Sequence, residues 1–210
     1  MDINNWNEKE VKRAETTWGH TFPEYTKDMY NFATSKGSSF LDLGCGFGRF
    51  LEYLLDVKLE PDYIGYDSSP VMIDRIRERF PEYFTRVFVH NITDKITHPQ
   101  ESIVISAVLI HLTQQHQKVI LNNISELRPL PKSITFDINS PSDRLKIKQS
   151  DFERIILTTK DSTGGFRMTW QSHYDMTDFV LQLFPQYSLT TKFYDLKQGR
   201  KKVLYMLELK

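Results

Sequence analysis

The stretch LDLGCGFGRF, residues 41–50, decides the fold, because three glycines stand at every second position behind an apolar run and an aspartate. Glycines between a strand and a helix let a ligand approach the backbone at the N-terminus of the helix. The dinucleotide-binding fingerprint places its third glycine where this chain has Arg49, which argues against a pyrophosphate cofactor. No Gly-Lys-Ser or Gly-Lys-Thr follows, so the stretch is not a phosphate-binding P-loop.

Asp67 is the next indication of a nucleoside site, because it ends a second predicted strand at the edge where doubly wound sheets bind ligands. A carboxylate at this position can accept hydrogen bonds from both hydroxyls of a ribose. The alternative is a helix cap or a solvated turn residue. Because the glycine-rich stretch precedes Asp67 by about 20 residues, we favour the ribose.

The composition indicates a globular protein. Of the 210 residues 40% are hydrophobic and 26% are charged, which suits one domain with a full hydrophobic core. Basic and acidic residues number 27 each, so no excess of positive charge predicts a nucleic-acid partner. No apolar run reaches the roughly 20 residues of a membrane span, and the amino terminus lacks a signal-peptide core. We therefore expect a cytoplasmic protein that does not bind membranes.

The single cysteine, Cys45, lies inside the glycine-rich stretch. A lone cysteine excludes an internal disulfide and a cysteine-based zinc site. We interpret Cys45 as a small residue in a tight turn and not as a catalytic thiol, because no partner base is identifiable near it. Acidic residues and histidines are scattered without the spacing of metal ligands, so we expect no metal.

Short apolar stretches alternate with amphipathic ones along most of the chain. Strands are expected at residues 39–43, 62–67, 86–91, 102–108 and 133–139. Helices are expected at residues 7–36 with a break at Pro23, at 48–57, from the cap Ser69 and Pro70, at about 113–128 and at 175–184. The glycine turns KDSTGG and KQGRK each predict a hairpin. Strands that alternate with helices imply a parallel sheet with helices on both faces.

We expect one domain over residues 1–210, because the chain has no repeat, low-complexity segment or linker. Within it, residues 1–36 would form an N-terminal helical cap and residues 37–139 the cofactor-binding core. Residues 140–175 would form a hairpin insertion that could act as a substrate lid. Residues 176–210 would add a C-terminal helix and hairpin.

Four segments between residues 38 and 139 resemble motifs I to IV of the class I S-adenosylmethionine-dependent methyltransferases. These segments are LDLGCGFG, YIGYDSS, VHNITD and SIVISAVLIHL. The resemblance implies a Rossmann-like, doubly wound α/β fold, with helices on both faces of a seven-stranded sheet. The sheet would be mostly parallel, with an antiparallel last strand. The implied cofactor is S-adenosylmethionine.

The resemblance also assigns cofactor contacts to nine positions near the ends of the first four strands. These positions are Asp42, Gly44, Cys45, Gly46, Asp67, Ser68, Asn91, Ile92 and Ser106. Asp42 and the glycine loop would hold the methionine amino and carboxylate groups, and Asp67 would hold the ribose. Asn91 would face the adenine where many relatives carry aspartate, and Asp94 is the alternative. Ser106 would lie near the methionine portion.

Methyl transfer from a sulfonium needs proximity and orientation, and it needs proton removal when the acceptor is a hydroxyl. His111 follows the fourth strand, and because the histidine side chain ordinarily titrates near neutral pH, it is our candidate general base. The alternative is a helix-start residue bonded to local backbone. Substrate contacts could come from Trp18, Tyr25, Trp170 and His173. Helical spacing favours a core role for the first two.

The sequence thus predicts an enzyme that methylates an oxygen or nitrogen of a small molecule, such as a sugar or a secondary metabolite. One alternative is a protein or RNA methyltransferase. Against it stand the balanced charge and the segment SAVL, which replaces the Asn/Asp-Pro-Pro-Tyr element of many such enzymes. Another alternative is a non-catalytic subunit that binds S-adenosylmethionine. The expected partner is a small-molecule methyl acceptor, and the oligomeric state is left open.

Overall fold

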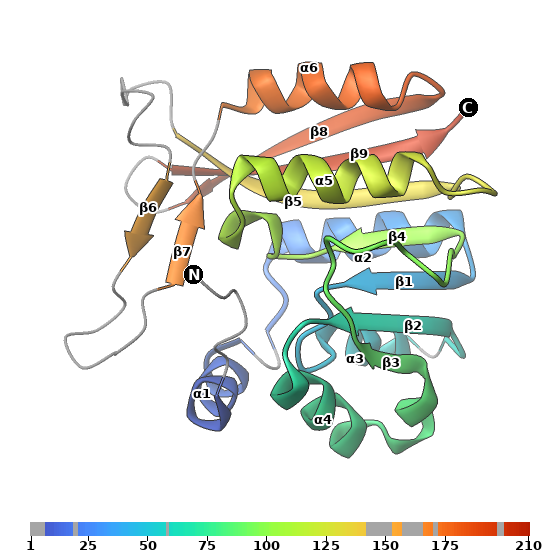
Figure 1. Ribbon diagram of the computed structural model, residues 1–210, viewed down its shortest axis with the longest axis vertical. Coiled ribbons are helices and arrows are strands. Elements are labelled where there is room, and N and C mark those ends of the chain that lie inside the picture. The colour runs from blue at the N-terminus through green and yellow to red at the C-terminus, as the bar shows by residue number, and fades with distance from the viewer. Residues whose placement is uncertain are drawn as a thin grey trace.

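A seven-stranded sheet forms the centre of the molecule (Figure 1). The computed structural model describes residues 7–18, 21–57, 59–141, 153–156, 166–169, 172–196 and 200–210. The strands of the sheet are β1 (Ser39–Leu43), β2 (Asp62–Asp67), β3 (Val87–Val89), β4 (Ser102–Ile105), β5 (Ser133–Pro141), β8 (Tyr187–Leu196) and β9 (Arg200–Leu209). Their spatial order is β3-β2-β1-β4-β5-β9-β8. Strands β1 to β5 pair in parallel, and β9 is antiparallel to both β5 and β8.

The strand order reverses between β1 and β4. The chain starts with β1, adds β2 and β3 on one side, and then returns to place β4 on the other side. The loops that follow β1 and β4 therefore leave the sheet in opposite directions, at the position where doubly wound folds bind their ligands. The predicted fold class is confirmed.

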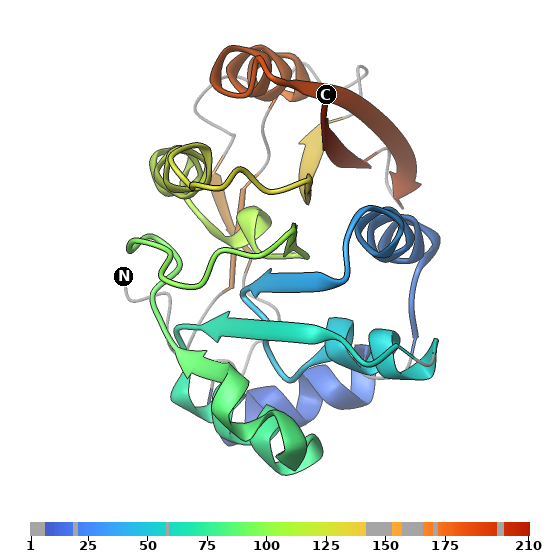
Figure 2. The same cartoon turned by 90° about the vertical axis from the view of Figure 1, so that its right-hand side faces the viewer.

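Helices cover both faces of the sheet, as Figure 2 shows. On one face lie α2 (Glu24–Lys36), α3 (Arg49–Asp56) and α4 (Pro70–Arg79), and on the other lie α5 (Gln114–Ser125) and α6 (His173–Leu183). Buried residues three or four positions apart give each helix one apolar side, as in α5 with Ile120 and Ile124. Helix α1 (Glu8–Trp18) packs against α4.

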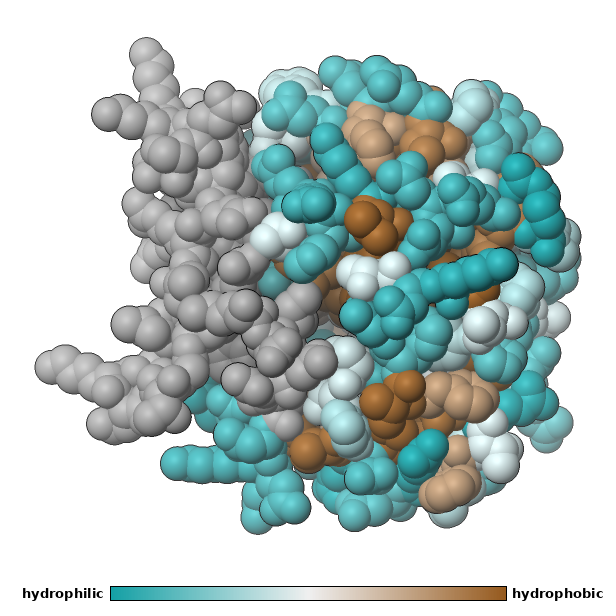
Figure 3. Space-filling model, viewed as in Figure 1, coloured by the Kyte–Doolittle hydropathy of each residue, from teal (hydrophilic) through white to brown (hydrophobic). Residues whose placement is uncertain are grey.

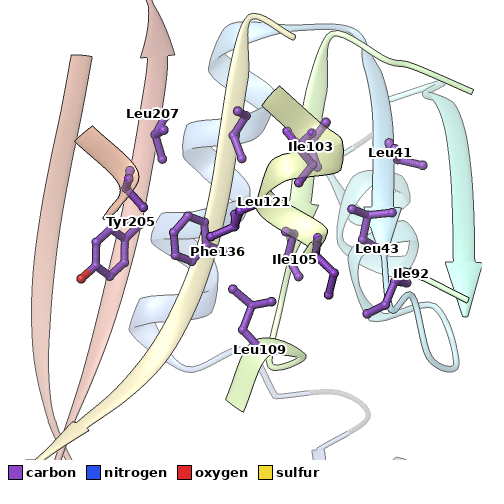
Figure 4. Close-up of a cluster of buried hydrophobic side chains, with 14 of the residues drawn as sticks. Leu41, Leu43, Ile92, Ile103, Ile105, Leu109, Leu121, Phe136, Tyr205 and Leu207 are labelled. Atoms are coloured by element: carbon purple, nitrogen blue, oxygen red, sulfur yellow. The ribbon is translucent and has the colours of Figure 1, made fainter. Parts of the chain in front are cut away.

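The two faces of the sheet carry two hydrophobic clusters, because successive side chains of a strand point to opposite faces. Leu41 and Leu43 of β1 belong to the cluster beneath α5 and α6, whereas Phe40 belongs to the cluster beneath α2 and α3. Figure 4 shows the first cluster, in which the rings of Phe136 (β5) and Tyr205 (β9) stack with their centroids 4.8 Å apart. The sheet is therefore buried on both sides.

Two strands are shorter than the sequence predicts. The fourth strand was expected over residues 102–108, but β4 ends at Ile105, because Ala107 has a positive φ of 57° and cannot continue a strand. A short 3₁₀ helix, η2 (Leu109–His111), follows. The third strand was expected over 86–91, but β3 spans only Val87–Val89. A 3₁₀ helix, η1 (Pro81–Arg86), precedes it, and Asn91 begins a turn.

The predicted starts of α4 and α5 are accurate, whereas α6 begins at His173 and not at residue 175. Ser69 and Thr113 both accept a hydrogen bond from a backbone N–H in the first turn of α4 and α5, as helix caps do. The ends are less accurate, since α5 stops at Ser125 and not near 128. The expected break at Pro23 is confirmed by the separate helices α1 and α2.

Strands β6 (Glu153–Ile156) and β7 (Phe166–Thr169) pair antiparallel in a separate two-stranded sheet, which agrees with the first predicted hairpin. They lie beyond the ends to which the parallel strands point, on the same side as α1 (Figure 1). β7 lies against η2. His173 was expected in this hairpin, but it is the first residue of α6.

Figure 3 shows the surface over α5 and α6, on which hydrophobic side chains form separate spots among hydrophilic ones. The exposed hydrophobic residues belong to different elements, such as Val119 on α5, Leu181 on α6 and Val89 on β3. In the part of the chain that the structure describes, no helix is both long enough and apolar enough to cross a membrane.

We expect Phe136→Ala to lower the free energy of unfolding by about 3 to 5 kcal/mol, because it removes a fully buried ring and leaves a cavity against Tyr205. Urea denaturation would measure the change. The control is Leu181→Ala, which shortens a half-exposed side chain and should change the free energy by less than about 0.5 kcal/mol. Equal effects from both variants would contradict the described core.

Candidate functional site

The glycine loop between β1 and α3 combines close packing with one open position. Gly44, Gly46 and Gly48 all have positive φ, of 81°, 54° and 90°, which favours glycine at each of them. A Cβ atom at Gly44 would overlap the side chain of Val108, and one at Gly48 would lie 2.8 Å from Ile76. A Cβ atom at Gly46 would meet nothing within 4 Å, so the backbone is open to a ligand there.

Asp67 connects this loop to the loop after β2. Its Oδ2 accepts a hydrogen bond from the N–H of Gly46 at 2.9 Å, and its Oδ1 accepts one from the N–H of Ser69 at 2.9 Å. Removal from bulk water raises the pKa of Asp67, and the two N–H donors counteract part of that rise. Each carboxylate oxygen keeps a lone pair for a further donor. Ser68 lies beside it and is partly exposed.

Asp42 lies beneath the glycine loop and does not face an open space. Its side chain is 2% exposed, and its Oδ2 accepts a hydrogen bond from the Tyr63 hydroxyl at 2.9 Å. Burial raises the pKa of Asp42 to about 7; the Tyr63 hydroxyl lowers it in part, and the nearby charge of Asp67 raises it further. The role of Asp42 toward a methionine amino group stays a prediction, and the contact seen here is within the protein.

Cys45 is buried against β2, where its Sγ would lie 3.0 Å from a Cβ atom on Gly65. Burial raises the pKa of its thiol well above the usual range, and the charges of Asp67 and Asp42 add to the rise. A neutral, buried thiol is a poor nucleophile. This environment agrees with the interpretation of Cys45 as a small packing residue.

The loop after β3 presents the predicted adenine contacts in a defined turn. The side-chain oxygen of Asn91 accepts hydrogen bonds from the N–H of Thr93 at 3.1 Å and from its hydroxyl at 2.9 Å. Asp94 is exposed, and Ile92 is buried in the core cluster beneath α5. The oxygen that we expected to face the adenine is therefore already engaged within its own turn.

The turn after β4 brings Ser106 close to α2 and to the glycine loop. The Tyr30 hydroxyl lies 3.5 Å from the Oγ of Ser106, and Val108 packs on Gly44. Two residues that sequence reasoning missed hold this turn. The Oδ1 of Asp137 accepts a hydrogen bond from the N–H of Ala107 at 2.6 Å, and its Oδ2 pairs with Lys202 at 2.6 Å. A charged residue inside the apolar strand SITFDIN was the available signal.

Of the proposed base and substrate residues, the structure describes the side chains of His111, Tyr25 and His173. His111 is the last residue of η2, is partly exposed and has β7 beside its helix. The Tyr25 ring lies 5.2 Å from the Nζ of Lys202. The Nδ1 of His173 lies 3.1 Å from the Oγ of Ser140. The side chain of Trp18 and all of Trp170 fall outside the described residues. Among the residues that the structure describes, no cluster of ligands could hold a metal ion.

Residues 41–128 match the profile of a protein family described as a methyltransferase domain. This match covers less than half of the chain. It falls within the segment, residues 38–139, in which the sequence resembles the class I S-adenosylmethionine-dependent methyltransferases, and it supports that resemblance. A sequence search of curated proteins found no match.

Solved structures of several methyltransferases have a similar fold. An S-adenosylmethionine-dependent methyltransferase from Clostridium acetobutylicum has a TM-score of 0.64 and 14% identity, over 96% of this chain and 98% of its own. A TehB-like S-adenosylmethionine-dependent methyltransferase from Corynebacterium glutamicum has a TM-score of 0.63 and 19% identity, over 97% of this chain and 100% of its own. Magnesium protoporphyrin IX methyltransferase from Synechocystis, solved with S-adenosylhomocysteine, has a TM-score of 0.62 and 14% identity, over 96% of this chain and 95% of its own.

The raised pKa of Asp42 predicts how the stability of the ligand-free protein depends on pH. Between the unfolded pKa of about 4 and the folded pKa of about 7, the native state binds more protons than the unfolded state. The free energy of unfolding therefore falls as the pH rises through this window. Asp42→Asn imitates the protonated carboxyl, so we expect it to gain stability over the wild type between about pH 5 and pH 8, by at most about 4 kcal/mol.

Urea denaturation at both pH values would measure this gain. The matched control is Asp74→Asn on the exposed side of α4, which should follow the wild-type pH dependence. A constant difference between Asp42→Asn and the wild type at the two pH values would contradict the buried, proton-binding state of Asp42.

Proposed function

We propose that this protein is a methyltransferase that transfers the methyl group of S-adenosylmethionine to an oxygen or nitrogen atom of a small molecule. The observation that carries the proposal is the bridge that Asp67 makes between the N–H groups of Gly46 and Ser69. The bridge lies where the strand order reverses, next to the open position at Gly46. The sulfonium supplies an already activated methyl group, so the protein mainly contributes binding, orientation and proton removal.

The residues near the loop fit a nucleoside with an attached amino acid. The free lone pairs of Asp67 would accept hydrogen bonds from the two ribose hydroxyls. The backbone at Gly46 would contact the methionine portion, and Ser106 would line the same portion from the turn after β4. The adenine would lie near Ile92, with Asn91 or Asp94 at its amino group. Because the Asn91 oxygen is engaged with Thr93, we favour Asp94 for that contact.

Three observations favour a small-molecule acceptor. The chain has equal numbers of acidic and basic residues, which gives no general attraction to a polyanion. The segment after β4 lacks the Asn/Asp-Pro-Pro-Tyr element of many enzymes that methylate amino groups of nucleic acids or proteins. One protein of similar fold is named for a small-molecule acceptor, magnesium protoporphyrin IX. A protein or RNA acceptor is the second candidate, and methylation assays with each class of acceptor would separate the two.

His111 is the residue that we propose as the general base. It ends η2, immediately after the turn that carries Ser106, so it stands on the side of the fourth strand and away from Asp67 on the second. A neutral imidazole can take the proton of a hydroxyl as the methyl group moves. A subunit that only bound the cofactor would need no base at this position.

We expect the protein to bind S-adenosylhomocysteine and not NAD in isothermal titration calorimetry. Asp67→Ala should weaken this binding by about 1.5 to 3 kcal/mol for each ribose hydrogen bond lost. The matched control is Asp62→Ala, which removes an exposed carboxylate from the other end of the same strand and should leave the affinity unchanged. Binding of NAD without S-adenosylhomocysteine would refute the proposed function. An unchanged affinity in Asp67→Ala would refute the ribose contact alone.

We expect His111→Ala to lower kcat for a hydroxyl acceptor by about 10²- to 10⁴-fold, because general bases contribute on this scale. The affinity for S-adenosylhomocysteine should stay close to that of the wild type, since the residue faces the acceptor side. Steady-state kinetics and calorimetry on the same variant would measure both quantities. Retained kcat would reduce His111 to a structural residue, and lost cofactor binding would show that it contacts the cofactor.

A further inference from the structure

A buried ion pair joins β5 to β9 near the proposed cofactor site. The Nζ of Lys202 lies 2.6 Å from the Oδ2 of Asp137, and the two residues are 4% and 0% exposed. The ring of Tyr25 from α2 covers the ammonium group at 5.2 Å. Neither charge faces solvent, so the pair contributes nothing to the solubility or the surface charge of the protein.

The second oxygen of Asp137 holds an unfavourable backbone conformation. Its Oδ1 accepts a hydrogen bond from the N–H of Ala107 at 2.6 Å. Ala107, with φ of 57°, is the only non-glycine residue of the described chain that has a positive φ. A left-handed conformation is unfavourable for an L-residue with a Cβ atom, and it persists where surrounding contacts enforce it. The carboxylate of Asp137 is such a contact.

The turn that Asp137 holds packs directly on the glycine loop. Val108 occupies the space that a Cβ atom on Gly44 would need, and the Oγ of Ser106 lies 3.5 Å from the Tyr30 hydroxyl. A change in the backbone at Ala107 would therefore move the side chain that supports Gly44. The chain of contacts runs from Lys202 through Asp137 and the turn to the loop that borders the methionine portion.

Stability alone gives little reason to keep this pair. A buried ion pair loses the hydration of both charges, and replacement by well-packed apolar residues is often neutral or stabilising. We propose that Asp137 and Lys202 are positioning residues that hold the turn at residues 106–108 against the glycine loop and thereby shape the cofactor site. Lys202 pairs with the carboxylate of Asp137 and orients it, and Asp137 fixes Ala107. The proposal rests on the proposed function, because S-adenosylhomocysteine is the probe of the site.

Two double variants separate the charge of the pair from its hydrogen bond to Ala107. D137N/K202M removes both charges and keeps a side-chain oxygen that can accept the N–H of Ala107. D137L/K202M removes the charges and the acceptor but keeps the apolar volume. We expect D137N/K202M to bind S-adenosylhomocysteine within about threefold of the wild type, and D137L/K202M about tenfold or more weakly. Both should melt no lower than the wild type.

Amide hydrogen exchange measured by NMR reports on the turn at residues 106–108 without any ligand. The chain has only three alanines, Ala14, Ala33 and Ala107, so selective ¹⁵N-alanine labelling gives three amide signals. The N–H of Ala107 should exchange slowly with solvent in the wild type and in D137N/K202M, and quickly in D137L/K202M. Ala14 and Ala33 lie in α1 and α2 and serve as internal controls.

Two further variants test why the affinity for S-adenosylhomocysteine falls in D137L/K202M. Glycine adopts a positive φ without the cost of a Cβ atom, so adding A107G to D137L/K202M should restore most of the affinity. Y187F removes a buried hydrogen bond to Pro131 at the opposite end of the sheet. It should lower the melting temperature without changing the affinity, which distinguishes positioning from general destabilisation. If D137L/K202M does not fold, D137S/K202M withdraws the acceptor with a shorter side chain and takes its place.

The outcomes are distinct. Wild-type affinity in D137L/K202M, despite fast exchange at Ala107, would overturn the positioning role. If both double variants lost melting temperature and affinity together, Asp137 and Lys202 would have only a structural role. Absence of binding to the wild-type protein would refute the proposed function instead, and the exchange of Ala107 would still show whether Asp137 holds the turn.

Discussion

The arrangement of the site depends on one carboxylate that accepts hydrogen bonds from two loops. Asp67 at the end of β2 binds the backbone N–H groups of Gly46 after β1 and of Ser69 before α4. Backbone amides are obligatory donors, and an acceptor that satisfies two of them fixes the distance between their loops. Because the loop at Gly46 is open to a ligand on its other side, the same contact that orders the protein also shapes the surface at which we propose that the cofactor binds.

The glycine loop also contacts the strands on both sides of β1. Its N–H groups at Gly44 and Cys45 donate to the carbonyl oxygen of Tyr66 on β2, and its close side packs on Val108 after β4. A residue larger than glycine at position 44 would push the turn after β4 away. The three strands that meet at the reversal of strand order therefore hold their loops in one packed unit, which limits reorganisation when a ligand binds.

Local signals in the sequence were sufficient for the strands β1 and β2, the caps of α4 and α5, the glycine loop and the position of Asp67, because neighbouring residues determine each of them. Contacts between distant residues were not predictable in this way. The partner of Asp42 is 21 residues away on β2, and the partner of Asp137 is 65 residues away on β9. The early end of β4 has the same origin, since alanine has no preference for a positive φ and Asp137 supplies the reason for it.

Strand β9 lies between β5 and β8, although it is the last of the three along the chain. On a ribosome, β5 would therefore remain an open sheet edge after its own synthesis, until residues 200–209 emerge and pair with it. Lys202 lies on β9, so Asp137 has no ion-pair partner until that strand has been synthesised. The sheet next to the glycine loop is completed by a contact of long sequence separation, and such contacts form slowly. Nascent chains of this protein should consequently complete the proposed binding site late, together with the closure of the sheet.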